Sequence, residues 1–125
     1  MTRILASALI IGSILCSASL ASAYEFQCRS GRIEKSNGST WGAAQRSGSD
    51  IRIEKSGSTV GYVKRSGSDW RIEASNGSTI GYLKSGRIEK SNGSTWTDVG
   101  TAKSFADCKG PVAAGLWVLD KEGRL

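Results

Sequence analysis

The chain repeats one short unit four times, and this repetition constrains its fold more than any other feature. Each unit reads Arg-Ile-Glu, then Lys or Ala, a turn rich in Ser, Asn and Gly, and finally Ser-Thr before an apolar residue. The units begin at Arg32, Arg52, Arg71 and Arg87, so successive copies start 20, 19 and 16 residues apart. A unit of this kind forms one supersecondary element, which buries its apolar side by packing against its neighbours.

Each unit has the pattern of a β-hairpin. Asn-Gly accepts the positive φ angles of a type I′ turn, and residues that favour strands flank it. The links 46–50 and 65–69 have the same sequence, Arg-Ser-Gly-Ser-Asp, and they predict turns that lead into the next hairpin. Segments 24–31 and 119–123 resemble half units. If they pair, the hairpins close without exposed strand edges. We therefore expect an all-β closed ring or shallow barrel of about four hairpins.

The segment Gly110–Leu119 interrupts the repeat and is the most apolar part of the chain after residue 23. Its pattern is compatible with a buried strand or with a short helix that plugs the ring, because periodicity alone does not separate the two in a short apolar run.

Residues 1–23 have the pattern of a signal peptide. Arg3 precedes an apolar stretch, no acidic residue occurs before Glu25, and Ala21-Ser22-Ala23 supplies a small-x-small cleavage site. We expect cleavage after Ala23, a secreted or periplasmic product, and a single domain over 24–125. A retained anchor or a lipid on Cys16 are the less favoured alternatives. No later segment is long and apolar enough to predict a membrane span.

Two cysteines, Cys28 and Cys108, remain in the expected mature chain. Exported proteins meet an oxidising compartment, so we expect a disulfide between them rather than two free thiols. The chain contains no His, which excludes Ser-His-Asp triads, Cys-His pairs and His-ligated zinc sites. We expect no cofactor, no metal and no enzymatic activity.

The best candidates for a ligand site are apolar and aromatic residues that recur once per unit, together with neighbouring aromatic residues. They are Trp41, Val60, Tyr62, Trp70, Ile80, Tyr82 and Trp96. Such side chains would line a pocket at the centre of the ring, but a small barrel also needs large side chains simply to fill its core. Both interpretations remain open on the sequence.

The repeated Arg and Glu of each unit lie two residues apart, so on a strand they share one face while Ile occupies the other. We expect a solvated ladder of opposite charges with pairs between neighbouring strands. The 16 basic and 11 acidic side chains that follow Ala23 leave a positive balance, which favours acidic partners. Because basic and acidic residues alternate instead of clustering, nucleic acid is not an expected partner.

The hairpin pattern with Gly-Tyr and an apolar residue after the turn resembles the β-flower family of small bacterial repeat proteins. Ile72–Leu83 and Ile53–Val63 carry the resemblance best, and it extends over 30–84. The resemblance implies a shallow barrel of hairpin petals around an apolar channel, similar to tubby-like lipid-binding domains, and no enzymatic activity. Arg-Ile-Glu stands here where the family has Tyr-Asp, so no ligand preference transfers.

From these observations we expect a non-enzymatic binding protein with an apolar or amphipathic, lipid-like ligand in a central channel. The alternative is a structural or envelope-interaction protein that binds an anionic surface or an envelope polysaccharide through its Arg/Glu face. A hollow centre favours the first and a packed centre the second. The sequence does not determine the ligand or the oligomeric state.

Overall fold

A computed structural model describes residues 24–125 of the chain. The expected signal peptide, residues 1–23, lies outside the described residues, and so does the proposed cleavage after Ala23.

The described residues form one ten-stranded sheet and two helices. The strands are β1 (Phe26–Arg29), β2 (Arg32–Lys35), β3 (Thr40–Ser47), β4 (Asp50–Lys55), β5 (Ser58–Ser66), β6 (Asp69–Ala74), β7 (Thr79–Lys84), β8 (Arg87–Lys90), β9 (Thr95–Asp98) and β10 (Ala106–Asp107), and the helices are α2 (Val99–Phe105) and α3 (Gly110–Lys121). The sheet order is β10-β1-β2-β3-β4-β5-β6-β7-β8-β9. Neighbouring strands are antiparallel except β1 and β10, which are parallel.

Each copy of the repeat forms an antiparallel hairpin, namely β2–β3, β4–β5, β6–β7 and β8–β9. In every hairpin the register shifts between the Ile and the Glu of the unit, so that one extra residue stands on the second strand. The extra residues of the four bulges are Trp41, Val60, Ile80 and Trp96. A bulge of this kind bends the strand and increases its twist, which helps the sheet to curve.

The prediction of type I′ turns at Asn-Gly is wrong. In the first copy only Gly38 has a positive φ, +90°, and its N–H donates to the carbonyl of Lys35 at 2.9 Å. Asn37 instead accepts from the backbone N–H of Ser39 at 3.0 Å. The loop thus has three residues with a single left-handed glycine, a common alternative to the two-residue turn. The type I′ pattern of two positive φ angles occurs at Ser56 and Gly57.

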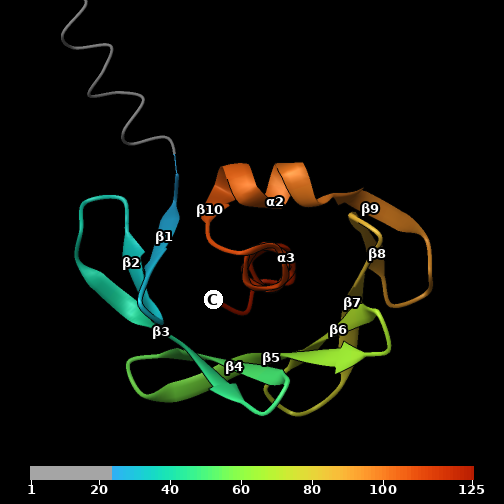
Figure 1. Cartoon of the computed structure of the whole chain (residues 1–125), viewed down its shortest axis with the longest axis horizontal. Helices are drawn as coiled ribbons and strands as arrows, with labels where there is room; N and C mark the ends of the chain where they lie inside the picture. Colours follow the sequence, from blue (N-terminus) through green and yellow to red (C-terminus); the bar gives the residue numbers. More distant parts are fainter. Residues whose placement is uncertain (1–23) are drawn as a thin grey trace, which may run out of the picture.

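The sheet curves around α3, which Figure 1 shows end-on at the centre. Residues 112–119 of this helix are all buried. The isoleucines of the four Arg-Ile-Glu motifs, Ile33, Ile53, Ile72 and Ile88, are fully buried as well. The segment that the sequence left open as strand or helix is therefore a helix, and it occupies the centre of the molecule with its own side chains.

The predicted closure of the ring by the two half units is wrong. Residues 119–121 belong to α3 rather than to a strand, and the outer neighbour of β1 is β10, where Phe26 lies opposite Ala106. A helix satisfies its backbone hydrogen bonds internally, so this apolar segment can be buried on all sides at the centre. Pro111 at its first turn is compatible with that start.

The sheet is not closed into a barrel, because β9 and β10 form its two edges. Helix α2 lies across the gap between them (Figure 1). The N–H of Val99 at its start donates to the carbonyl of Gly86, and the carbonyl of Phe105 at its end accepts from the N–H of Glu25, both at 2.8 Å. Helix α2 therefore bridges the open side of the sheet.

The predicted disulfide between Cys28 and Cys108 is confirmed, with a sulfur–sulfur distance of 2.07 Å. It connects Cys28 of β1 to Cys108, which lies directly before the N-cap of α3, Lys109. Among residues 24–125, no helix has the length and apolar character needed to cross a membrane.

Candidate functional site

Five of the seven predicted ligand residues pack against the chain's own core. Trp41 and Ile80 are buried, and Val60, Trp70 and Trp96 are half-buried against the core cluster. The ring of Trp41 meets that of Phe26 edge-on at 4.9 Å between centroids, and Trp96 meets Trp117 of α3 at 5.3 Å. Because α3 fills the centre, these residues do not line a hollow channel.

Tyr62 and Tyr82 lie on the opposite, outer face of the sheet. Tyr62 is the cross-strand neighbour of Glu73, and Tyr82 that of Glu89. The ammonium group of a lysine two residues further along the same strand lies 5.0 Å from the ring centroid of Tyr62 and 4.7 Å from that of Tyr82. The structure therefore divides the predicted site between two faces of the sheet.

The predicted solvated ladder is also corrected, because three of its four glutamates are buried. Glu34, Glu73 and Glu89 are only 6%, 4% and 6% exposed. Each forms an ion pair with the Arg two residues earlier on its own strand, for example Arg71 with Glu73 at 2.7 Å. Each also has a second cation on a neighbouring strand, such as Lys64 Nζ at 3.2 Å from Glu73. Buried carboxylates need such partners to offset their lost hydration.

Most cations of the described chain are held by an acid or by an aromatic ring. Arg29, Arg32, Arg52, Lys64, Arg71, Lys84 and Arg87 form ion pairs. Lys35, Lys55, Arg65, Lys90 and Lys121 lie over aromatic rings. Within residues 24–125, neither kind of contact is present for Arg46, Lys103, Lys109 and Arg124. Three of these four cations line the same pocket.

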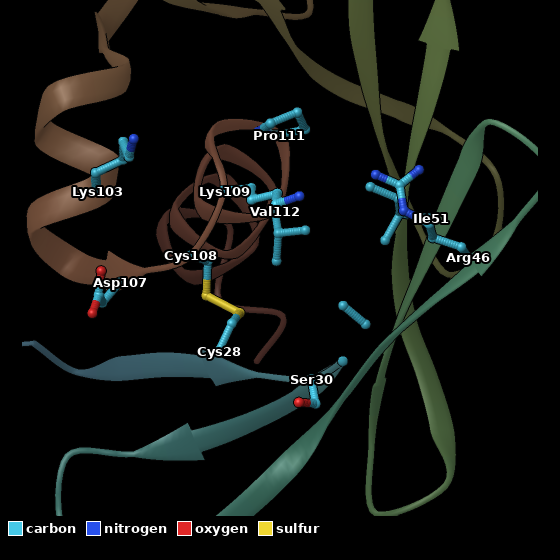
Figure 2. Close-up of a pocket in the computed structure, with 12 residues that line it drawn as sticks. Cys28, Ser30, Arg46, Ile51, Lys103, Asp107, Cys108, Lys109, Pro111 and Val112 are labelled. Atoms are coloured by element: carbon cyan, nitrogen blue, oxygen red, sulfur yellow. A yellow bond between two sulfur atoms is a disulfide. The ribbon is translucent and has the colours of Figure 1, made fainter.

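This pocket, called the cationic pocket below, has a volume of about 760 Å³. Its lining comes from β1, β3, β4, β10, α2, the β1–β2 turn and the start of α3. The lining residues are Cys28, Ser30, Gly31, Ala44, Arg46, Ile51, Lys103, Asp107, Cys108, Lys109, Pro111 and Val112. Figure 2 shows the disulfide at the pocket, with Lys103 on the α2 side and Arg46 on the sheet side. Asp107 is the one acidic residue of the lining.

Arg46 is available because of a difference between two copies of the repeat. Its counterpart Arg65 lies opposite Trp70 on the neighbouring strand, and its guanidinium carbon is 5.0 Å from the Trp70 ring centroid. Arg65 Nε also donates to the carbonyl of Gly67 at 2.9 Å. Arg46 lies opposite Ile51 instead, which offers no ring. The guanidinium of Arg46 is therefore left at the pocket without an aromatic partner.

The other two cations come from the helical part of the chain. Lys103 is an exposed residue of α2, and Lys109 is the N-cap of α3 without a side-chain hydrogen bond to the helix. The start of a helix carries partial positive charge on its free N–H groups. The lining therefore carries two lysines, an arginine and this helix start against a single carboxylate, that of Asp107, which makes the pocket electropositive.

Sequence reasoning identified Cys28 and Cys108 but missed the three cations of the pocket. Arg46 could have been found by comparing Arg46–Ile51 with Arg65–Trp70. The two segments are identical except for their last residue, which is Ile in the first and Trp in the second. Lys103 and Lys109 lie outside the repeat, where no pattern placed them beside β1 and β3.

A second, smaller hollow of about 410 Å³ lies at the other end of α3 and includes two of the predicted ligand residues, Ile80 and Trp96. Lys90 and Glu122 also line it, and Lys90 Nζ lies 5.6 Å from the Trp96 ring centroid. Its cation is thus already engaged, in contrast to those of the cationic pocket.

Asp98 is the N-cap of α2, and the N–H of Thr101 donates to its carboxylate at 2.9 Å. This backbone hydrogen bond lowers the pKa of Asp98 below its ordinary value of 3.8. Among the residues that the structure describes, no group of three or more His, Cys, Asp or Glu is arranged to hold a metal ion.

No family model, no curated protein and no solved structure matches this chain.

Proposed function

We propose that the protein is an exported, non-enzymatic binding protein that takes a small anionic ligand with an apolar portion into the cationic pocket. The observation that carries this proposal is the gathering of Arg46, Lys103 and Lys109, which have no acidic or aromatic partner in the described chain, around one cavity. Cations that line one cavity can provide charge-assisted hydrogen bonds to a carboxylate, phosphate or sulfate bound there.

The lining also supports an apolar part of the ligand. Ala44, Ile51, Pro111 and Val112 contribute hydrocarbon surface next to the cations. A volume of about 760 Å³ lies within the range of ordinary small-molecule pockets. The amphipathic ligand expected from the sequence is therefore proposed to bind in this pocket at the start of α3 instead of in a central channel.

Binding rather than catalysis is proposed because the pocket offers cations and a single carboxylate, Asp107. Glycoside hydrolysis, an acid–base reaction that needs no His, uses two carboxylates facing each other across a cleft. The buried glutamates of the repeat are each already paired with an arginine.

The test is an NMR titration of the purified protein with octanoate, an amphipathic anion. Octanol and octylammonium serve as the neutral and cationic analogues. We expect octanoate alone to shift the signals of the pocket residues. Lys103→Gln and Arg46→Gln should each weaken its binding about tenfold, the worth of one hydrogen bond to a charged group. Arg124→Gln removes the same charge outside the pocket and should leave binding unchanged. Equal effects of all three substitutions would overturn the proposal.

The envelope-interaction alternative has support of its own from the outer face. Glu73 and Glu89 each pair with two cations, so each of these units keeps an excess positive charge beside a half-buried tyrosine. Heparin serves as the probe of this face. Binding that weakens as salt rises and that falls on Lys64→Gln, but not on Lys103→Gln, would support this second candidate.

A further inference from the structure

The disulfide is part of the wall of the cationic pocket. Both of its cysteines line the cavity, together with Lys103 and Lys109 (Figure 2). An anion bound by these cations therefore lies in the same cavity as the sulfur–sulfur bond.

The two sulfur-bearing residues differ in accessibility. Cys28 on β1 is half-buried, whereas Cys108 is only 8% exposed. A nucleophile that enters from the pocket mouth therefore reaches Cys28 more easily, and which sulfur is attacked is partly a matter of access.

The surroundings of Cys108 suit a leaving group. Cys108 directly precedes Lys109, and α3 starts there without a side-chain cap. A neighbouring cation and the positive end of a helix stabilise a thiolate over a thiol. The departure of a stabilised thiolate accelerates thiol–disulfide exchange.

We propose that the Cys28–Cys108 disulfide is an exchange site for low-mass anionic thiols, which the cationic pocket attracts. The sulfur of the incoming thiolate forms a bond to Cys28 Sγ while the bond between Cys28 and Cys108 breaks. The electron pair of that bond leaves with Cys108 Sγ, which departs as a thiolate. One disulfide is consumed and one mixed disulfide is formed, so the thiol is the only co-reactant. This inference rests on the proposed function only for the attraction of anions to the pocket.

The experiment measures the rate of mixed-disulfide formation by mass spectrometry after alkylation of free thiols. Glutathione is the anionic probe and cysteamine the cationic one, both at equal thiolate concentration and low salt. We expect glutathione to react about tenfold faster, as for electrostatically steered encounters, and to be attached to Cys28 in a peptide map. Lys103→Gln, on an exposed position of α2, should remove most of this preference, while Arg124→Gln should preserve it.

Equal rates for the two thiols, an adduct carried by Cys108, or an intact disulfide in a folded protein would each overturn the exchange proposal. Octanoate titration of the same samples separates this failure from failure of the proposed function. If octanoate binds and no mixed disulfide forms, the binding function stands and the exchange inference falls. If octanoate does not bind but glutathione reacts with the expected preference, the binding function falls and the exchange inference stands.

Discussion

The arginines at positions 46 and 65 show how one residue difference between two copies of a repeat changes what a cation does. Each is the penultimate residue of its strand, β3 or β5, and each precedes the same Ser-Gly-Ser-Asp sequence. Trp70 holds Arg65 by its ring, whereas Ile51 leaves Arg46 free at the pocket. A ring under a guanidinium contributes about 0.5–1 kcal/mol at an exposed site, which favours that position of the guanidinium. The residue opposite the cation therefore determines whether its guanidinium lies over a ring or at the pocket.

A pH prediction also belongs to the residue scale. The pKa of Asp98 is lowered by the hydrogen bond from Thr101, so its folded-state pKa lies below its unfolded value. Such a group contributes stability that is fully present above the unfolded pKa and is lost as pH falls through the folded pKa. We expect Asp98→Ala to lower the free energy of unfolding at pH 7, and this difference from the wild type to become smaller in acid well below pH 3.8, where the neutral carboxyl is a weaker acceptor.

Urea unfolding of both proteins at neutral and acidic pH measures this difference. Asp120→Ala provides a control, because its carboxylate is exposed and accepts no hydrogen bond within the part of the chain that the structure describes. A penalty for Asp98→Ala that stays the same at both pH values would contradict the assignment of this cap.

At the scale of elements, α3 depends on a close approach to the sheet. A Cβ added to Gly115 would lie 2.5 Å from Val63 Cγ2 and 3.1 Å from Ile53 Cδ1. On the facing strand, a Cβ on Gly61 would lie 2.9 Å from both methyl carbons of Leu119. Glycine on both sides of the contact therefore lets the helix settle against β4 and β5.

We expect Gly115→Ala to destabilise the protein by about 1–3 kcal/mol, because the added methyl group overpacks a closed core. The intrinsic preference of helices for Ala over Gly, about 1 kcal/mol, acts in the opposite direction. Gly100→Ala in the exposed helix α2 receives the same propensity gain with only the Asp98 carboxylate nearby, and should be neutral or stabilising. Thermal unfolding of the two variants compares them directly. If Gly115→Ala proves as stable as Gly100→Ala, the close packing of α3 is wrong.

The elements differ in how far they could be predicted from the sequence. The hairpins could be predicted because strand-forming segments alternate with Gly-rich turns, and this pattern occurs in four copies. The turn type at Asn37 was missed because Asx hydrogen bonding and a third loop residue replace the two-residue turn. Segment 119–123 resembles the repeat, but the apolar run before it, with Ala113, Ala114 and Leu116, favours one continuous buried helix. The tertiary environment of that run, not its local likeness to the repeat, determined its structure.

Of the candidate site, only the disulfide could be predicted from the sequence, because its pairing does not depend on how the chain folds around it. The pairing of Cys28 with Cys108 follows from their number and the expected compartment. The positions of Lys103 and Lys109 depend on how α2 crosses the open side of the sheet, and no local pattern encodes that crossing. For the same reason the sequence left open whether the aromatic residues fill the core or line a channel, and the structure places most of them against the core around α3.

At the scale of the whole molecule, the shortest strand pairing lies at the seam between the first strand and the C-terminal segment. Strands β1 and β10 pair through only two residues each, Phe26 with Ala106 and Gln27 with Asp107. Helix α2 spans the rest of the gap with hydrogen bonds at its two ends. The disulfide links the two sides of this seam and encloses a sequence separation of 80 residues.

Loss of the disulfide should therefore destabilise the whole fold and, in particular, open the cationic pocket. The loop-entropy relation gives about 4 kcal/mol for a loop of this length. We expect the double variant Cys28→Ser, Cys108→Ser to lose about this free energy in urea unfolding, and the reduced wild type to match it. Hydrogen exchange should show the largest loss of protection at β1, β10 and the start of α3, because these elements meet at the seam. A uniform loss over all strands would mean that the disulfide acts only on the unfolded chain, and the pocket wall would then keep its structure without it.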